Sequence, residues 1–422
     1  MPKQKDIPFA SIEFGTHSIK VLIGEFTADG LTIIGNAETE SLKVIKGEIS
    51  NLNMVGEQLT QAIDQAQQKA GVDIQDAFFT LLISGSYISQ SIVTSDININ
   101  SPDRLITQDD IDNVIRNARL KDTSPKMDTL NTSNRFYTLS DGRQVLDPLG
   151  LPSQSLQTSL LLIQARKDRI RTPINLINQC LDRDPNDITY VPMALGRACL
   201  SSEEVSRDGQ ILIDLGAGVT SYALFTMAGC HTAGQITVGF EQAANDLSIA
   251  FGLPIQFARN LLKNFASLKL SAISTNDGRD RLIDVERGPG TLPRRIAASS
   301  IEQVVQLRFT ELFQIIKERL QRDNAWQWAT GNVRLSGGLA SLPGITALAH
   351  DILEHDVIIA NPFNVRGPSE IIGNPAFIAP IGALRCAKDA LDIFNNQTQG
   401  TQEKSQSATS NIINTLRNFL NF

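Results

Sequence analysis

The feature of this 422-residue sequence that most constrains its fold is a motif that occurs twice. "ASIEFGTHSIKVLIGEF" begins at Ala10, and "ILIDLGAGVTSYALF" begins at Ile211. Each is an apolar segment that ends in a carboxylate, then a glycine-containing turn, then a second segment rich in β-branched residues, which is the pattern of a β-hairpin. Two such hairpins so far apart predict a duplicated α/β fold, in which one hairpin opens each half.

The rest of the chain divides around these hairpins. "VRLSGGLASLPGITALAHDIL" predicts a strand, a Gly-Gly turn and a helix, and apolar periodicity predicts helices at 54–70, 108–119 and 297–320. A β-rich stretch between the halves predicts an insertion, and we expect its residues 121–136 to form a surface loop. The predicted parts are a first half (1–82 and 166–206), an inserted small α+β domain (83–165), a second half (207–394, with a smaller subdomain at 240–332), a flexible linker (395–410) and a terminal amphipathic helix (411–422).

Composition argues against several classes of function. The net charge of −7 and the pI near 5.3 argue against nucleic-acid binding, which requires a basic surface. The four cysteines have no paired spacing, which fits a reducing cytosol better than disulfides or a zinc site. No apolar segment has the length of a signal peptide or reaches the ~18 residues of a membrane span, so we expect a cytoplasmic protein.

The glycine turns indicate phosphate binding. Successive backbone N–H groups in a tight turn bind anions, and glycine lacks the Cβ that would keep a phosphate away. One such turn is more often structural, but three in this order favour a nucleotide. The carboxylates Glu13 and Asp214 would hold the waters of a Mg²⁺ ion. The predicted ATP-contacting residues are Gly15, Thr16, His17, Ser18, Lys20, Asp214, Gly216, Ala217, Gly218, Val219, Thr220, Gly337 and Gly338.

The last residues, "NIINTLRNFLNF", form a separate pattern. Five apolar residues fall on one face of a helix: Ile412, Ile413, Leu416, Phe419 and Leu420. The segment before them is rich in Gln, Ser and Thr and cannot bury apolar surface. So short a helix is marginal in water and needs a surface on which to fold. Two surfaces fit the pattern: a groove on the same protein, or a lipid interface.

These motifs resemble those of the FtsA family of actin-like bacterial cell-division proteins, within the actin/Hsp70/hexokinase superfamily. "IEFGTHSIKVLIGE" is similar to the family's first phosphate motif, "IDLGAGVTSYALF" to the second and "LSGGLASLPG" to its adenosine motif. The likeness extends over essentially the whole chain. It implies an actin-like (Hsp70-type ATPase) fold with a small inserted domain, and it adds Gly239 and Leu339 to the nucleotide site.

The resemblance also implies a function. It predicts a protein that anchors FtsZ filaments to the cytoplasmic membrane, polymerises in an actin-like way and recruits later divisome proteins through the inserted domain. The terminal helix would be the lipid anchor, on the cytoplasmic face of the inner membrane at the division site. The FtsZ C-terminal peptide would bind at Arg308 and Glu311. The residues alone favour a simpler interpretation, an i, i+3 salt bridge on a solvated helix, and it is the family resemblance that favours the peptide site.

Several positions depart from the family's pattern, and all of them concern the nucleotide pocket. Glu13 stands where Asp is usual, Tyr222 replaces an acidic residue, and Phe240 replaces a glycine. Leu339 stands in place of a third glycine, and Arg259 and Leu262 replace the family's acid and lysine near the adenosine. Hydrolysis requires a positioned water and a base or orienting group, and no residue is assigned that role. We therefore expect weakened binding of ATP and Mg²⁺, with slow or absent turnover.

Two other functions fit parts of the sequence. A sugar-kinase-like enzyme of the same fold would need a catalytic Asp and a sugar pocket between the halves, and the altered phosphate motifs argue against it. An actin-like adaptor of type IV pilus assembly shares the inserted domain. That relative generally lacks the linker and the terminal amphipathic helix, so the tail favours the cell-division protein.

Overall fold

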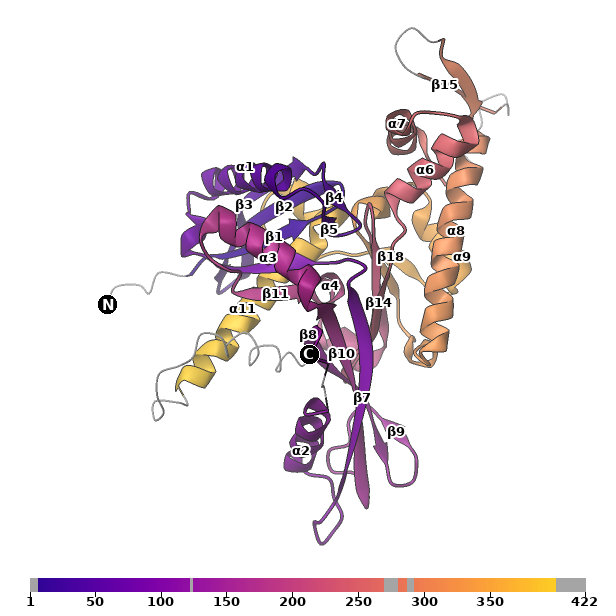
Figure 1. The fold of residues 1–422 in the computed structure, drawn as a ribbon. Coiled ribbons are helices and arrows are strands. Elements are labelled where there is room, and N and C mark those ends of the chain that lie inside the picture. Colours follow the sequence, from indigo (N-terminus) through magenta and orange to yellow (C-terminus); the bar gives the residue numbers. More distant parts are fainter. Residues whose placement is uncertain (1–6, 122–123, 269–279, 287–291, 400–422) are drawn as a thin grey trace.

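The computed structural model describes residues 7–121, 124–268, 280–286 and 292–399 (Figure 1). Two mixed sheets form its centre. The first sheet has the strand order β11-β6-β1-β2-β3-β19. Its strands are β1 (Phe9–Phe14), β2 (Ser18–Thr27), β3 (Gly30–Glu40), β6 (Phe78–Ile83), β11 (Asp187–Tyr190) and β19 (Val365–Arg366). A short hairpin follows β3, and its strands β4 (Val44–Ile45) and β5 (Glu48–Ile49) have two residues each.

The second sheet repeats the arrangement of the first. Its order is β14-β13-β12-β17-β18, with β12 (Gln210–Leu215), β13 (Thr220–Thr226), β14 (Gly229–Ile236), β17 (Val333–Ser336) and β18 (Val357–Ile359). In both sheets an antiparallel meander of three strands opens the half, and its first strand then pairs in parallel with a later one. The predicted duplication of an α/β unit is therefore confirmed.

Helices cover both faces of the first sheet. α1 (Leu52–Ala70) packs on β2 and β3 through its apolar stripe. The Asn51 side chain caps its start by accepting from the Met54 N–H, and Gly71 ends it in the left-handed conformation that glycine allows. α3 (Lys167–Leu181) packs against α1. The sheet's other face is covered by α11 (Ile378–Gln399).

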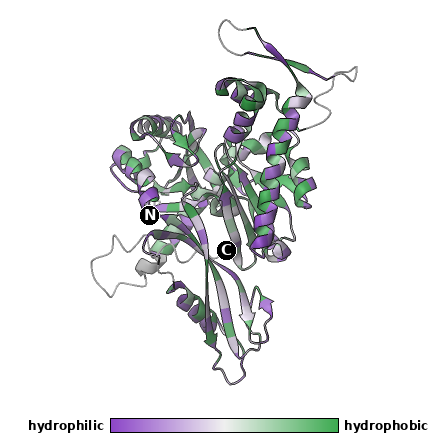
Figure 2. Ribbon diagram, turned by 45° about the vertical axis from the view of Figure 1, so that its right-hand side comes forward, coloured by the Kyte–Doolittle hydropathy of each residue, from purple (hydrophilic) through white to green (hydrophobic). Residues whose placement is uncertain are grey.

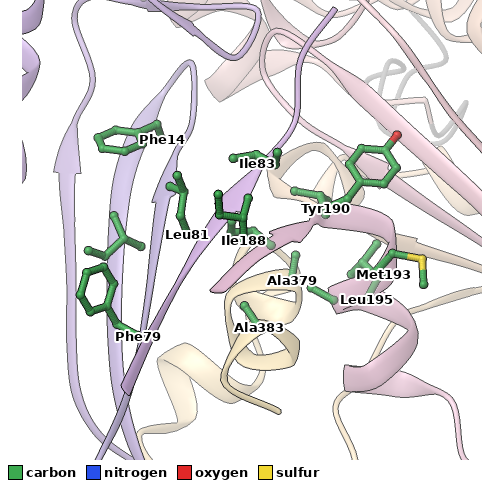
Figure 3. Packing of buried hydrophobic residues seen from close by; sticks show 14 of the residues in the cluster. Phe14, Phe79, Leu81, Ile83, Ile188, Tyr190, Met193, Leu195, Ala379 and Ala383 are labelled. Atoms are coloured by element: carbon green, nitrogen blue, oxygen red, sulfur yellow. The ribbon is translucent and has the colours of Figure 1, made fainter. Parts of the chain in front are cut away.

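The two halves meet at a pair of closely packed helices. α4 (Val191–Cys199) contacts both β12 of the second sheet and α11. Figure 3 shows small residues of α11, Ala379 and Ala383, next to Met193 and Leu195 of α4. Nearly all of α4 is buried. α5 (Ser202–Arg207) then leads into the second half, beginning with a capping box of Ser201 and Glu204.

The inserted domain lies between β6 and α3 and extends away from both sheets (Figure 1). Its four-stranded sheet has the order β7-β10-β8-β9, with β7 (Ile88–Asn98), β8 (Met127–Leu139), β9 (Gln144–Val145) and β10 (Ser155–Arg166). The predicted helix at 108–119 is confirmed as α2 (Gln108–Arg119), whose apolar face joins a small separate core with β8 and β10.

The prediction of a surface loop at 121–136 is wrong. β8 begins at Met127, pairs with β10 along its length, and is buried from Leu130 to Arg135. Two of the buried polar residues in this segment have partners in the second half. The Ser133 hydroxyl accepts from the Cys230 N–H (2.6 Å), and Arg135 donates through Nε to the His231 carbonyl (2.8 Å).

The smaller subdomain of the second half lies between β14 and β17. It contains α6 (Phe240–Phe251), α7 (Ile255–Phe265), the hairpin β15 (Leu282–Val285) and β16 (Arg294–Ala297), and α8 (Ala298–Arg322). Figure 2 shows hydrophilic and hydrophobic residues alternating along the ribbon of α8, as expected for a helix with one buried face and one exposed face. α9 (Ile345–Leu353) and the short α10 (Ser369–Ile372) complete the second half.

The helix α11 continues into the segment that was predicted to be a flexible linker. Residues 395–399 belong to α11 rather than to a linker. The first turns of α11 are well buried, which stabilises the helix. The residues that follow are Asn, Gln and Thr, which include no strong helix breaker before Gly400. The rest of the predicted linker and the apolar residues Ile412, Ile413, Leu416, Phe419 and Leu420 lie outside the described residues. No helix in the described part of the chain has the length and hydropathy needed to cross a bilayer.

Candidate nucleotide site

The two predicted phosphate turns have the same backbone geometry. In the first, the Gly15 N–H donates to the Ser18 carbonyl (3.0 Å), and in the second the Gly216 N–H donates to the Val219 carbonyl (3.1 Å). A Cβ at Gly15 would lie 2.7 Å from the Ser18 oxygen, and one at Gly216 would lie 2.5 Å from the Val219 oxygen. Each turn therefore requires glycine at its first position, because its own carbonyl approaches so closely.

The turns face one another across a cavity of about 440 Å³ between the two halves. Fourteen of the predicted site residues line it: Glu13, Gly15, Thr16, His17, Ser18, Lys20, Asp214, Gly216, Ala217, Gly218, Val219, Gly337, Gly338 and Leu339. Residues predicted from three separate sequence motifs are thus brought together at one place.

Two of the predicted residues support the second turn without lining the cavity. The Thr220 hydroxyl donates to the Val238 carbonyl (2.8 Å). A Cβ at Gly239 would lie 2.2 Å from the Gly216 carbonyl oxygen, so only glycine lets this segment pass so close to the turn. The next two backbone N–H groups then donate to the carbonyls of Gly216 and Ala217.

The third glycine turn closes another side of the cavity. Gly337 has φ of 84°, and a Cβ there would lie 2.4 Å from the Leu215 carbonyl oxygen. Gly338 differs, because a Cβ built on it meets nothing within 4 Å. Leu339, in place of the third glycine of the family, is buried in the core of the second half. This end of the cavity is apolar, lined by Leu262, Ala266, Leu342, Pro343, Ala376 and Ala379 among others.

Charged groups gather at the ends of β1 and β2. Lys20 lies opposite Glu13 in the hairpin, and its Nζ is 2.9 Å from Glu13 Oε2. Burial alone would lower the pKa of Lys20, but Glu13, with Glu38 and Asp214 nearby, more than offsets this and raises it. The ammonium therefore stays charged and is paired with Glu13 in this structure.

Asp214 lies at the corresponding end of β12. Burial, and then the neighbouring charge of Glu13, raise its pKa to about 7, although Lys20 and a hydrogen bond with Ser336 oppose this. Carboxylate oxygens suit Mg²⁺, but Glu13 already binds Lys20. Within the described ranges, no three His, Cys, Asp or Glu side chains are arranged to hold a metal ion. A magnesium ion would fit here only if phosphates and water supplied most of its ligands.

The departures from the family's motifs have clear structural partners. The Tyr222 hydroxyl lies against Gly234, where a Cβ would be 2.5 Å from it. Phe240, at the start of α6, faces His17 with 6.4 Å between ring centroids, and both line the cavity. Arg259 is bonded to Glu241 (2.6 Å) on the exposed side of the smaller subdomain. These residues do not supply an obvious base for hydrolysis.

The predicted partner site lies elsewhere, on α8 and α6. Arg308 pairs with Glu311 on its own helix, which is the i, i+3 salt bridge expected from the residues alone. It also forms a bidentate pair with Asp246 of α6, through Nε (2.6 Å) and the second terminal nitrogen (2.9 Å). The hydrogen bond to Asp246 raises the pKa of Arg308. The sequence pattern missed Asp246, because it precedes Arg308 by 62 positions and no local spacing relates them.

The duplicated sheets and the glycine turns between them define the actin-like class of proteins, and known structures agree. The PilM–PilN type IV pilus biogenesis complex matches with a TM-score of 0.63 at 13% identity, covering 90% of this chain and 98% of that one. MreB5 of Spiroplasma citri bound to AMPPNP matches with a TM-score of 0.51 at 13% identity, covering 94% of this chain and 100% of that one. At such low identity these matches establish the fold alone.

Two family models then identify the group within this class. A model described as "Cell division protein FtsA" matches residues 211–382, and one described as "SHS2 domain inserted in FTSA" matches residues 85–164. The chain belongs to the FtsA family of cell-division proteins. The fold class predicted from the sequence, an actin-like α/β fold with a small inserted domain, is confirmed.

Characterised relatives extend the match to most of the chain. The cell division protein FtsA of Pseudomonas aeruginosa is 26% identical over 374 residues, 88% of this chain and 87% of that protein. The FtsA of Escherichia coli K12 is 24% identical over 387 residues, 90% of each. The FtsA of Bacillus subtilis is 26% identical over 372 residues, 86% of this chain and 81% of that protein.

Proposed function

We propose that this protein anchors FtsZ filaments to the cytoplasmic face of the inner membrane at the division site, and that a nucleotide bound between its halves holds it in the working conformation. The observation that carries the nucleotide part is the convergence of three glycine turns on one cavity. Its relatives named as cell division protein FtsA support the cellular role. Polymerisation and recruitment of later divisome proteins through the inserted domain belong to the same proposal.

The cavity suits a nucleoside polyphosphate such as ATP. The turns at 15–18 and 216–219 would hold the phosphates with backbone N–H groups, and Lys20 would exchange Glu13 for a phosphate oxygen. The apolar end near Gly338 would pack against the base. Magnesium, when bound, would neutralise phosphate charge; Glu13 and Asp214 would orient its waters. Because no residue is assigned the role of base or of orienting the attacking water, we expect little turnover.

The proposed binding site for the FtsZ C-terminal peptide is centred on Arg308. Its guanidinium is held between Asp246 and Glu311 and keeps a quarter of its side-chain surface exposed. The same two helices carry apolar side chains in water: Leu307 of α8 is 65% exposed and Ile249 of α6 is 74% exposed. A charged group beside exposed apolar residues suits a short peptide of mixed character.

The proposed lipid anchor is the amphipathic segment at 411–422. Its apolar face carries five large side chains, each worth ~1.5–3 kcal/mol when fully buried, before the cost of ordering is subtracted. One copy would therefore bind a bilayer reversibly, and an assembly of copies would bind it firmly. Arg417 is the only basic residue in the segment, so binding should depend only weakly on anionic lipid.

Vesicle co-sedimentation tests the proposal. FtsZ is mixed with vesicles and ATP, together with the full chain, a chain ending at Gln399, or the full chain carrying Arg308→Glu. We expect FtsZ to pellet only with the unaltered full chain. The truncated chain should leave both proteins in the supernatant, and the R308E chain should pellet alone. Equal pelleting of FtsZ with all three chains would contradict the proposal.

A further inference from the structure

The hairpin of β13 and β14 runs from the candidate nucleotide site to the inserted domain. β13 begins at Thr220, directly after the second phosphate turn, and β14 leads back to the same turn through Val238 and Gly239. β13 is buried throughout, and the two strands are paired from Thr220 to Gly229. The pairing is interrupted only by a bulge at His231, between Leu224 and Phe225 of β13. A buried hairpin of this kind connects its two ends mechanically.

The outer edge of β14 is covered by side chains of the inserted domain. Arg135 of β8 donates to the His231 carbonyl (2.8 Å), and the Gln90 side-chain oxygen of β7 accepts from the Ala233 N–H (3.0 Å). Ser133 binds the Cys230 N–H at the hairpin's far end. We call Gln90, Ser133 and Arg135 the seam.

The seam also reaches the end of the long helix α8. Arg135 donates to the carbonyl of Asp323, which caps that helix (3.1 Å). The Asp323 carboxylate accepts from Gln90 (2.8 Å) and from the Thr232 hydroxyl (3.0 Å). Arg135 is 6% exposed and His231 is fully buried, so these bonds are shielded from water.

The base of the inserted domain, in contrast, is part of the first half. Its strands continue the chain from β6 and into α3, and the backbone of Arg166 donates to Tyr87 (3.1 Å) where they enter. Leu130, Leu161 and Ile163 share a core with the first sheet, and the same core includes Phe225, Cys230 and Ala233 of the second. The inserted domain therefore bridges the halves. Chain connections and apolar packing fix it to the first half, and the seam adds polar bonds to its apolar contacts with the second half.

We propose that the seam positions the two phosphate turns relative to one another, so that nucleotide binding in the cavity and attachment of the inserted domain to β14 are coupled. The first turn belongs to the first half and the second turn to the second half. A bridge that holds the halves in place lowers the cost of bringing both turns onto one ligand. By linkage, a bound nucleotide must strengthen the seam by the same factor. The inference rests on the proposed nucleotide binding.

Titration with a fluorescent ATP analogue tests the coupling. Arg135→Met and Gln90→Leu each break the seam without touching a residue that lines the cavity. We expect each to weaken binding at least ~5-fold, the lower end of usual coupling between sites. Arg143→Met is the control: it removes an exposed pair with Asp141 on the same domain and should change affinity less than ~2-fold. If R135M does not fold, Q90L decides the result.

Hydrogen exchange tests the reverse direction. Saturating nucleotide should slow exchange of the wild-type β8 and β14 amides and leave β9 unchanged, and this slowing should disappear in the seam variants. A wild-type chain that never saturates would overturn both this inference and the proposed nucleotide binding. Saturation with equal affinity in wild type, R135M and Q90L would overturn the coupling alone.

Discussion

The packing of α11 on α4 yields a sharp prediction, because Gly382 leaves no room for a side chain. A Cβ built on Gly382 would lie 1.8 Å from the Ala194 carbonyl oxygen, whereas real Cβ atoms essentially never approach a neighbour within 3.0 Å. Both atoms are on helix backbones, so Gly382→Ala must push the helices apart by about the 1.2 Å between those two distances. Because these two helices pack where the halves meet, the strain falls on the contact between the halves.

The size of the effect follows from two opposing contributions. Overpacking of a core costs ~1–3 kcal/mol, and more where backbone must move. The higher helix propensity of alanine offsets about 1 kcal/mol of that. Because a carbonyl of the facing helix backbone must move, the upper end of the overpacking range applies. We expect Gly382→Ala to lower the free energy of unfolding by ~2 kcal/mol, measured by urea denaturation followed by circular dichroism.

Gly56 provides a matched control in another helix. A Cβ there would meet the flexible end of Leu176 at 3.3 Å and the Cys180 sulfur at 3.8 Å, which is an ordinary contact distance. Gly56→Ala should therefore leave stability unchanged or raise it by up to ~1 kcal/mol. A Gly382→Ala variant that unfolds at the wild-type urea concentration would refute this description of the packing, as would an equal loss in both variants.

Two further predictions concern buried and exposed charges. Burial, and then the charge of Arg135, lower the pKa of His231 to about 3, so only the unfolded chain binds a proton there as pH falls through 6.5. Between pH 7 and pH 5 the free energy of unfolding of the wild type should fall by up to ~2 kcal/mol more than that of His231→Phe. Equal decreases in urea denaturation of the two proteins would argue against a neutral, buried ring. Arg308→Glu should weaken binding of an FtsZ C-terminal peptide at least ~10-fold by fluorescence anisotropy, about 1.4 kcal/mol. Arg259→Glu, on the same subdomain, should not; equal affinities for both would place the peptide elsewhere.

The parts of the fold predicted correctly are those encoded by local signals. The hairpins around Gly15 and Gly216 follow from a glycine forced by its own turn, and the helix at 108–119 follows from apolar periodicity and the Thr107 cap. Both features depend on residues within a few positions of one another. The meeting of three motifs at one cavity followed from the duplication and from the family resemblance, since periodicity alone does not bring distant turns together.

The errors arise where distant contacts override local preference. β8 has the polar composition of a loop, but hydrogen bonds to β14 let Ser133 and Arg135 enter the interior. Lys20 lines the cavity as predicted for a site residue, but its ion pair with Glu13 was not predicted. The bond from Arg308 to Asp246 joins two helices far apart in sequence. None of these partners can be identified from spacing along the chain.

Calorimetric titration of Mg²⁺-ATP into the wild-type chain and Gly338→Val tests the nucleotide site most directly. Gly338 lines the cavity, and a Cβ there would meet nothing within 4 Å. We therefore expect a valine to take up space needed by the ligand and to leave the melting temperature unchanged. We predict saturable binding by wild type and none by the folded variant. Equal affinity in both, or no saturation in either, would show that the three glycine turns do not hold a nucleotide.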